Sequence, residues 1–372
     1  MRVLMLSKAL VVGAYQQKLV EIARHGEIDL TAVAPPSWRD GAAERFIEQR
    51  EASGYRLIVS PIAANGNFHL FFFPQLPKIL DDCQPDLLHV EEEAYNLATF
   101  LAVWHARRRR IPSVFFTWQN IARRYPLPFR LMERYVYRNV GCAIAGTRSA
   151  ERVLRGKGYR GVVRVIPQFG VDPTVFSPAP EHPESSGADG GVITIGFAGR
   201  LVPEKGVEVL VDACARLDRP YRLVILGNGP ALPSIRARIR QYGIEDLVDI
   251  RNAIDSREMP QFLRSLDVLV LPSLTRPNWA EQFGRVLIEA MACGTPIIGS
   301  SCGEIPDVVG DAGLIVPEGN ASAIAEAVMR LAKDGRLRAD LIQLGRRRAL
   351  ERFTHARVAQ DTVDLYLACA KA

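Results

Sequence analysis

The sequence predicts an α/β protein built from two doubly wound domains. Short apolar runs alternate with helical patterns through residues 1–176. A segment rich in Pro, Gly, Ser and acidic residues follows at 177–191, and the alternation then restarts and continues to residue 353. Such alternation is typical of a parallel sheet covered by helices on both faces. A length of 372 residues also favours two cores over one.

The first domain is expected at 1–176. Its expected strands are 2–6, 29–33, 86–90, 113–116, 143–145 and 164–166, and its expected helices are 15–25, 96–109 and 129–139.

The second domain is expected at 190–353. Its expected strands are 192–197, 222–226, 248–251, 267–271 and 296–298, and its expected helices are 206–217, 232–242, 256–265 and 284–292. Ligands of such folds bind at the carboxyl ends of the strands, so the natural site is a cleft between the two domains. The last segment, 354–372, places its apolar residues on one helix face, which suits packing on either domain.

Composition narrows the class of protein. Hydrophobic residues make up 48% of the chain, and no apolar run has the roughly 18–20 residues that a membrane span needs. The apolar N-terminus carries Lys8 and lacks a cleavage pattern, so it indicates a first strand rather than a signal peptide. Six scattered cysteines without a CxxC favour a reducing cytoplasm, and argue against a disulfide framework or a zinc site.

The stretch from Gly199 to Gly206 follows an expected strand and opens a helix. Backbone N–H groups at such a helix start attract anions. Arg200 and Lys205 add two positive charges there, which would stabilise a departing diphosphate. A solvated basic turn is the alternative interpretation.

The stretch from Glu281 to Glu289 places two carboxylates on either side of Phe283 and Gly284. Gly284 lets the backbone approach a ligand, and the N–H groups after it can bind phosphate oxygens. Glu289 is acidic on an otherwise apolar helix, where it needs a partner. A ribose diol would be one partner, and a salt bridge another.

Two further loops follow strands in the second half. Asn228 and Gly229 indicate a contribution to donor binding, although a tight strand-to-helix turn explains them equally well. Arg251 and Asn252 lie where the nucleotide base is expected, without indicating which base. No D-x-D triplet occurs, so we expect no metal, and Arg200 with Lys205 would replace the cation.

These motifs resemble those of family-four glycosyltransferases. The resemblance rests on Phe197–Arg200 with Glu204–Gly206, on Leu271–Ser273, and on Glu281-x-Phe283-Gly284 with Glu289–Ala292 and Pro296. It implies the GT-B fold, in which two Rossmann-like domains face each other across a cleft and the terminal helix crosses back to the N-terminal domain. It also implies retaining chemistry without a metal or cofactor, and a nucleoside-diphosphate sugar as co-substrate.

The resemblance assigns roles to residues of the second half. The region from Glu281 through Phe283 to Gly284 would hold the donor sugar and phosphate, with Glu281 in a catalytic role. Arg200 and Lys205 would hold the diphosphate and assist catalysis. Glu289 would hold the ribose.

The first half departs from the family pattern. Many members have a histidine where this chain reads Trp118-Gln119-Asn120, so Gln119 would occupy the place of a catalytic histidine. An amide binds a sugar hydroxyl but is no general base near neutral pH. That suits a front-face mechanism, in which the leaving phosphate oxygen takes the acceptor proton.

Acceptor binding is expected from loops that follow other strands of the first half. Glu91, Glu92 and Glu93 follow a strand end, where they could meet an acceptor hydroxyl or act as a base, and Glu91 and Glu92 are the expected binding residues. A solvated acidic helix start is the alternative. Gly13, Tyr15 and Gln16 follow the first strand, and Trp118 adjoins Gln119.

The formal net charge of +6 is concentrated in the first half. Basic residues occur at Arg107–Arg110, and singly at Arg123, Arg124, Arg130, Arg134 and Arg138. With the aromatic segments 68–73 and 125–129, the Arg107–Arg138 region suits docking on an anionic membrane surface. A solvated face is the alternative, and no recognised motif favours nucleic acid.

The sequence therefore predicts a cytoplasmic glycosyltransferase, peripheral on the inner face of the membrane if that docking holds. It would transfer a sugar to a hydroxyl of a polysaccharide, glycolipid or small-molecule acceptor. The alternatives are a sugar-nucleotide epimerase or a phosphorylase on the same scaffold, or a binding module without turnover. The base, sugar, acceptor and oligomeric state are not determined by the sequence.

Overall fold

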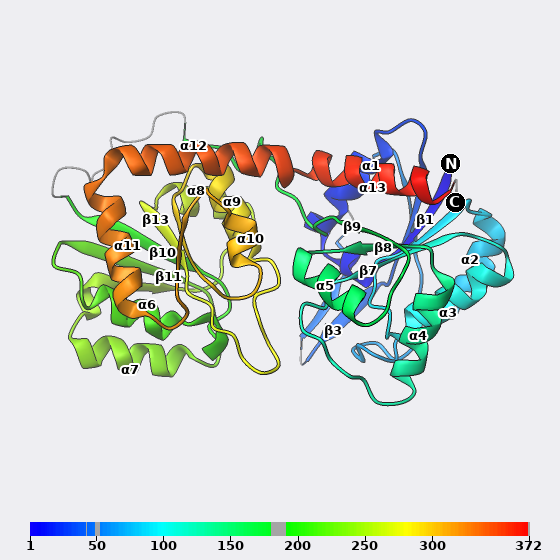
Figure 1. Cartoon of the computed structure of the whole chain (residues 1–372), viewed down its shortest axis with the longest axis horizontal. Helices are drawn as coiled ribbons and strands as arrows, with labels where there is room; N and C mark the ends of the chain where they lie inside the picture. The colour runs from blue at the N-terminus through cyan, green and yellow to red at the C-terminus, as the bar shows by residue number, and fades with distance from the viewer. Residues whose placement is uncertain (42, 49–52, 180–190, 371–372) are drawn as a thin grey trace. The chain divides into compact units, whose positions relative to one another are not determined.

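The computed structural model describes residues 1–41, 43–48, 53–179 and 191–370. The chain divides into a first unit, Met1–Gly170 with His355–Ala372, and a second unit, Val171–Thr354 (Figure 1). Most of the expected linker, 180–190, lies outside the described residues, as does the expected start of the second domain at residue 190.

The first unit contains a seven-stranded parallel sheet in the order β5-β2-β1-β6-β7-β8-β9. Its strands are β1 (Arg2–Leu6), β2 (Asp29–Ala34), β5 (Arg56–Val59), β6 (Leu87–Val90), β7 (Ser113–Thr117), β8 (Cys142–Ala145) and β9 (Val162–Val165). Its α-helices are α1 (Gln17–Ala23), α2 (Leu76–Cys83), α3 (Leu97–Arg108), α4 (Phe129–Asn139), α5 (Arg148–Gly156) and α13 (His355–Cys369). The short strands β3 (Ser37–Asp40) and β4 (Ala43–Phe46) pair with each other, and 3₁₀ turns lie at Lys8–Val11 and Gly13–Gln16.

The alternation of side chains along β1 shows how this sheet is buried on both faces. Val3 and Met5 enter one apolar cluster, together with residues of α1 and α13. Leu4 and Leu6 enter another cluster, with residues of α2 and α3. Strands buried on both faces read as continuous apolar runs, which is the pattern that the sequence shows.

The terminal helix α13 packs against α1 and belongs to the first unit. Tyr366 is fully buried, and its hydroxyl lies 2.7 Å from His89 Nδ1 of β6. Burial lowers the pKa of His89 to about 4, so the imidazole is neutral. The apolar periodicity alone left the partner of this helix open, but the family resemblance implied the N-terminal domain, and the structure confirms that placement.

One expectation about cysteines is wrong. Cys142 and Cys369 form a disulfide, with a Cα–Cα distance of 6.3 Å. The two residues lie in one apolar cluster, because β8 begins beneath the last turn of α13. A sequence separation of 227 residues hid this pairing. The other four cysteines are free.

The second unit contains a six-stranded parallel sheet in the order β12-β11-β10-β13-β14-β15. Its strands are β10 (Ile193–Ala198), β11 (Tyr221–Leu226), β12 (Val248–Arg251), β13 (Val268–Leu271), β14 (Ile297–Ser300) and β15 (Leu314–Val316). Its α-helices are α6 (Val207–Cys214), α7 (Leu232–Tyr242), α8 (Met259–Arg264), α9 (Arg285–Cys293), α10 (Ile305–Val309), α11 (Ala321–Lys333) and α12 (Gly335–Arg352), and 3₁₀ turns lie at Pro203–Lys205 and Glu245–Leu247.

Each sheet has one switch point, where the strand order reverses. It lies between β1 and β6 in the first unit and between β10 and β13 in the second. The carboxyl ends of strands at a switch point frame the ligand site of such sheets. The loops after these four strands are therefore where a functional site is expected.

Candidate functional site

At the switch point of the second unit, one ion pair joins the two loops. Lys205 Nζ lies 2.5 Å from a carboxylate oxygen of Glu281, and both side chains are largely buried. Ser273, just after β13, donates its hydroxyl to the same oxygen at 2.9 Å. The structure thus brings together two predicted site residues that lie 76 positions apart, and it adds Ser273, which the sequence reasoning did not assign.

The approach of these loops depends on Gly206. Its φ is +67°, and a Cβ there would lie 2.0 Å from the carbonyl oxygen of Pro272. Any other residue would push the loop after β13 away from Lys205. The backbone N–H of Leu274 also donates to the carbonyl of Glu204 at 2.8 Å. The glycine therefore sets the spacing between Lys205 and Glu281.

Gly284 precedes α9 in a left-handed conformation, with φ +70°. A Cβ there would lie 2.8 Å from the side chain of Leu287. No side chain caps the start of α9, so its N–H dipoles face the end of the sheet. This arrangement suits an anion.

Glu289 lies one turn into α9, with Arg285 Nε 2.7 Å from its carboxylate. Burial raises the pKa of Glu289, and Arg285 opposes that shift. The salt bridge that the sequence offered as one partner for Glu289 is therefore present within α9.

The other predicted donor residues occupy different surroundings. Arg200 is exposed, and no side-chain partner is recorded for it among the described residues. Asn228 is exposed, whereas Gly229 packs against the backbone of Leu201. Phe283 is buried against Phe353, with ring centroids 5.7 Å apart, so it supports the loop from beneath.

At the switch point of the first unit, Glu91 and Glu92 are buried. Glu91 forms an ion pair with Lys18, and Glu92 one with Lys8. Burial alone would raise the pKa of Glu91, but the charge of Lys18 and the hydrogen bond from its ammonium group lower it. Both predicted acceptor carboxylates are therefore engaged with lysines, which leaves them fewer free lone pairs for a ligand.

The neighbouring Glu93 completes the acidic triplet that the sequence places at this strand end, and its side chain is more exposed than those of Glu91 and Glu92. It is only partly buried by accessible surface. Its carboxylate accepts hydrogen bonds from the Thr117 hydroxyl at 2.8 Å and the Trp118 N–H at 2.7 Å. Desolvation raises its pKa to about 7, although those two bonds oppose the shift. Perturbed carboxyls at strand ends are frequent in functional sites.

Gln119 is held by two partners. Its amide NH₂ donates to the hydroxyl of Tyr125 at 2.7 Å, and its oxygen accepts from Lys157 Nζ at 2.8 Å. Lys157 also lies 2.5 Å from Glu133. These contacts fix which end of the amide faces which partner. Sequence reasoning missed Lys157 because α5 separates it from the loop.

The remaining predicted acceptor residues line the same end of the sheet. Trp118 Nε1 donates to Gln168 at 2.6 Å. The ring of Tyr15 lies 4.1 Å from that of Phe169. Gln16 is buried, and donates to the backbone carbonyls of Leu10 and Glu48 at 2.8 Å each.

Gly13 N–H donates to the carboxylate of Glu48 at 3.0 Å. Gly13 and Gln16 therefore shape the loop after β1 rather than present free polar groups.

A hollow of about 460 Å³ lies beside α8 in the second unit. Leu226 and Arg251, the last residues of β11 and β12, line it together with Phe262. Arg251 also pairs with Asp249 at 2.6 Å.

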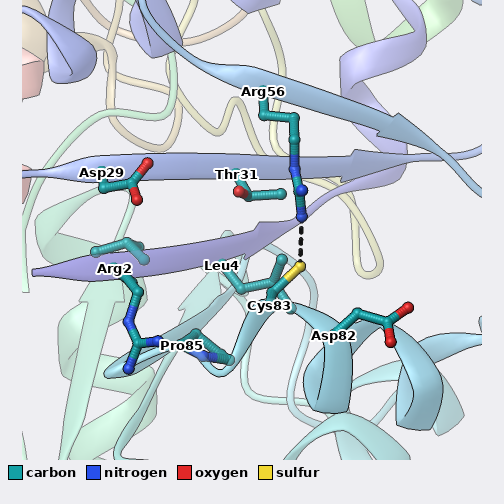
Figure 2. Close-up of a pocket in the computed structure, with 9 residues that line it drawn as sticks. Arg2, Leu4, Asp29, Thr31, Arg56, Asp82, Cys83 and Pro85 are labelled. Carbon is teal, nitrogen blue, oxygen red and sulfur yellow. Dashed lines mark hydrogen bonds between the residues drawn. The ribbon is translucent and has the colours of Figure 1, made fainter.

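A hollow of about 190 Å³ lies in the first unit at the amino ends of the strands, where β1 and β2 begin (Figure 2). There Arg56 donates to the sulfur of Cys83 at 2.7 Å (Figure 2). Because ligands of parallel sheets bind at the carboxyl ends of the strands, this hollow is no candidate for the main site.

Within the described residues, no cluster of His, Cys, Asp and Glu is arranged to hold a metal ion. Across the same residues, none of the helices combines the length and the apolar character that crossing a membrane requires.

Two family models match the chain. The model described as Glycosyltransferase Family 4 matches residues 20–175, and the model described as Glycosyl transferases group 1 matches residues 178–348. Together they cover nearly all of both units.

Curated relatives share about a third of the residues in the matched region. A D-inositol 3-phosphate glycosyltransferase of Jonesia denitrificans is 36% identical over 190 residues, covering 48% of this chain and 43% of the relative. The putative colanic acid biosynthesis glycosyltransferase WcaL of Escherichia coli is 34% identical over 196 residues, covering 51% and 46%. The chain spans about half the length of the curated relatives that it matches.

Solved structures resemble the whole chain. HepE of Anabaena in complex with UDP has a TM-score of 0.78 at 19% identity, covering 99% of this chain and 100% of that one. Sucrose-phosphate synthase of Thermosynechococcus elongatus has a TM-score of 0.73 at 22% identity, covering 99% and 98%. This likeness confirms the predicted GT-B class of fold, with two Rossmann-like domains.

Proposed function

This chain belongs to glycosyltransferase family 4, and on that premise we propose that it transfers a sugar from a nucleoside diphosphate to an acceptor hydroxyl. The observation that carries the proposal is the buried Lys205–Glu281 pair at the switch point of the second sheet. It places a cation and a carboxylate beside the uncapped start of α9. These are the groups that a diphosphate and a sugar hydroxyl need.

Lys205 would bind the donor diphosphate without releasing Glu281. An ammonium group has three N–H donors, and one donates to Glu281. A second can reach a phosphate oxygen. Arg200, exposed after β10, would add another charge. We propose that these two side chains neutralise the leaving diphosphate, with no resident metal or cofactor.

The chemistry we propose retains the configuration of the sugar, as the family resemblance implies. The bond between the anomeric carbon and the diphosphate oxygen breaks, and a bond from that carbon to the acceptor oxygen forms on the same face. The acceptor proton passes to the leaving phosphate oxygen. Glu281 would hold a sugar hydroxyl during this step, and Glu289 would exchange Arg285 for the ribose diol.

The acceptor would lie at the carboxyl ends of β6 and β7 in the first sheet, beside its switch point, where Glu93 accepts hydrogen bonds from Thr117 and Trp118. Gln119 keeps one N–H of its amide for a ligand after donating the other to Tyr125. Because Gln119 is no base, it would position a hydroxyl rather than remove its proton. We propose that Glu93 accepts a hydrogen bond from the same acceptor when it is ionised.

The names of the relatives indicate which donors and acceptors to test first. HepE was crystallised with UDP and with UDP-glucose, so UDP-sugars are the first donors to test. Inositol phosphate and polysaccharide intermediates are the acceptor classes that the names of the curated relatives suggest.

We propose the cytoplasm as the place of action. The Cys142–Cys369 disulfide is the observation against it, since disulfides are rare in reducing compartments. Alkylation of protein extracted without reductant, followed by mass spectrometry, distinguishes a reducing from an oxidising compartment. Labelling of Cys142 and Cys369 would support a reducing compartment, and protection of both would contradict it.

The experiment that tests the function measures nucleoside diphosphate release from UDP-, GDP- and ADP-sugars with an acceptor panel. Thermal shift selects the donor first, because ligand at about 100 times Kd raises the free energy of unfolding by about 2.7 kcal/mol. Glu289→Gln should weaken donor binding. If Glu289→Gln and Lys205→Ala, each made singly, both left turnover unchanged, the assignment of the donor site would be wrong.

A further inference from the structure

One face of the first unit combines exposed arginines with exposed leucines. Leu127 is 69% exposed and Leu131 is 57% exposed. Arginines surround them on the loop after β7 and on α4. We call this the arginine face; its exposed members are Arg124, Leu127, Arg130, Leu131, Arg134 and Arg138.

The positive charge of this face is not neutralised by neighbours. The only acidic residue between Trp118 and Asn139 is Glu133. It is buried and forms its ion pair with Lys157. Among the described residues, no ion pair is recorded for the four arginines of the face. An unpaired row of guanidinium groups is a binding surface for phosphate-bearing partners.

The arginines at the end of α3 differ from this face. Arg109 pairs with Asp81 at 2.7 Å, and Arg108 lies 4.7 Å from the ring of Trp104. They precede β7, so they lie toward the opposite edge of the sheet. The structure thus separates the Arg107–Arg138 region into two parts, of which only the second has unpaired arginines next to exposed leucines.

The arginine face adjoins the predicted acceptor site. Tyr125, inside the loop that begins the face, accepts the hydrogen bond from Gln119. His69 lies against the rings of Tyr125 and Phe129, at 6.1 and 5.0 Å. Its neighbours Phe68 and Leu70 are each 40% exposed. Additional apolar surface therefore lies close to the arginines.

We propose that the arginine face docks the protein on an anionic lipid bilayer. Guanidinium groups bind lipid phosphates, and aliphatic side chains such as Leu127 and Leu131 enter the interface between headgroups and acyl chains. Nucleic acid would use the arginines alone, and would leave two highly exposed leucines in water. Charge and apolar surface together favour the bilayer.

This inference stands apart from the proposed function, since docking needs no turnover. If the docking and the proposed sugar transfer are both correct, the acceptor is a membrane-borne molecule presented next to Gln119. Only this statement about the acceptor rests on the proposed function.

Vesicle co-sedimentation tests the docking directly. The full chain is mixed with vesicles of phosphatidylcholine containing about one third phosphatidylglycerol, and with phosphatidylcholine alone. Binding is expected to the anionic vesicles only, and to weaken in about 0.5 M salt because screening shortens the range of the attraction.

Two variants separate this face from general basic charge. Arg130→Glu with Arg134→Glu should lower partitioning by at least about 25-fold, at about fivefold for each arginine. Arg346→Glu with Arg347→Glu makes the same charge change at exposed positions of α12 in the second unit, and should leave partitioning nearly unchanged. Circular dichroism confirms that each variant folds.

A third variant tests the leucines. Leu127→Ser with Leu131→Ser should lower binding to anionic vesicles several-fold at constant charge. If both arginine variants lose binding equally, docking is non-specific and the proposal is wrong. It is also wrong if the unaltered chain ignores anionic vesicles, or if it binds single-stranded RNA more tightly than vesicles and the leucine variant binds both as before.

Discussion

In the second unit the switch point between β10 and β13 presents a lysine and the start of α9, whereas in the first unit the switch point between β1 and β6 is followed by three glutamates. Lys205 and the α9 dipole attract negative charge. In the first unit, lysines engage Glu91 and Glu92, and Glu93 alone is left with a carboxyl near its titration point. The same topological position therefore suits an anion in one sheet and hydroxyl groups in the other.

The largest expected effect comes from removing the cation of the second unit. Lys205→Ala should lower kcat/KM for the donor by roughly 100- to 1,000-fold, because the leaving diphosphate loses a charge in a partly buried site. Steady-state release of nucleoside diphosphate measures it. The variant also leaves Glu281 without its ammonium, so thermal unfolding should be recorded in parallel.

Lys333→Ala, at an exposed position of α11, is the matched control and should retain full activity. Lys205→Arg, which keeps the charge, should recover part of the loss. If Lys205→Ala and the control behave alike, the two switch points do not differ in function as proposed.

An intermediate effect is expected beside the first switch point, in the loop that follows β7. Gln119→Ala should lower the transfer rate by roughly tenfold, the value of one hydrogen bond made during reaction. Donor affinity should stay constant, since the change lies in the other unit. Thermal shift with the donor and transfer assays at saturating donor separate the two, with Gln343→Ala on α12 as control. A loss confined to donor affinity would contradict the assignment.

The sequence indicated the site residues of the second unit more fully than those of the first, and the reason is physical. The helix start at Gly284 and the strand end at Gly199 are local patterns, so their residues could be assigned from spacing. The ion pairs join distant residues in both units, 73 positions apart for Lys18 and Glu91 and 76 for Lys205 and Glu281. Lys8 and Lys18, however, carry no motif that marks them as partners. Which of three adjacent glutamates stays open depends on those partners, and that information is absent from local spacing.

The same distinction between local and distant information explains which helices and strands were predicted correctly. The expected bounds of α4, α7 and β12 agree with the structure, because clear apolar periodicity and breakers flank them. Strand β5 was missed, since its apolar run of Leu57, Ile58 and Val59 is only three residues long and the strand is partly exposed. The disulfide required the tertiary structure, whereas the packing of α13 on the first unit agrees with what the family resemblance implied.

The smallest expected effect concerns the pH dependence of stability in the first unit. The pKa of Glu93 is about 7 in the folded chain and about 4.5 when exposed. Between these values the folded state binds more protons than the unfolded state, so the free energy of unfolding falls as pH rises from about 4.5 to about 7. Glu93→Gln should remove on the order of 1 to 2 kcal/mol of that fall. Urea unfolding across this pH range measures it, and Glu351→Gln at an exposed site should keep the slope of the unaltered chain. An unchanged slope in Glu93→Gln would mean that Glu93 is ionised throughout, so that all three glutamates of the first switch point are fixed anions and the contrast with the second unit rests on charge alone.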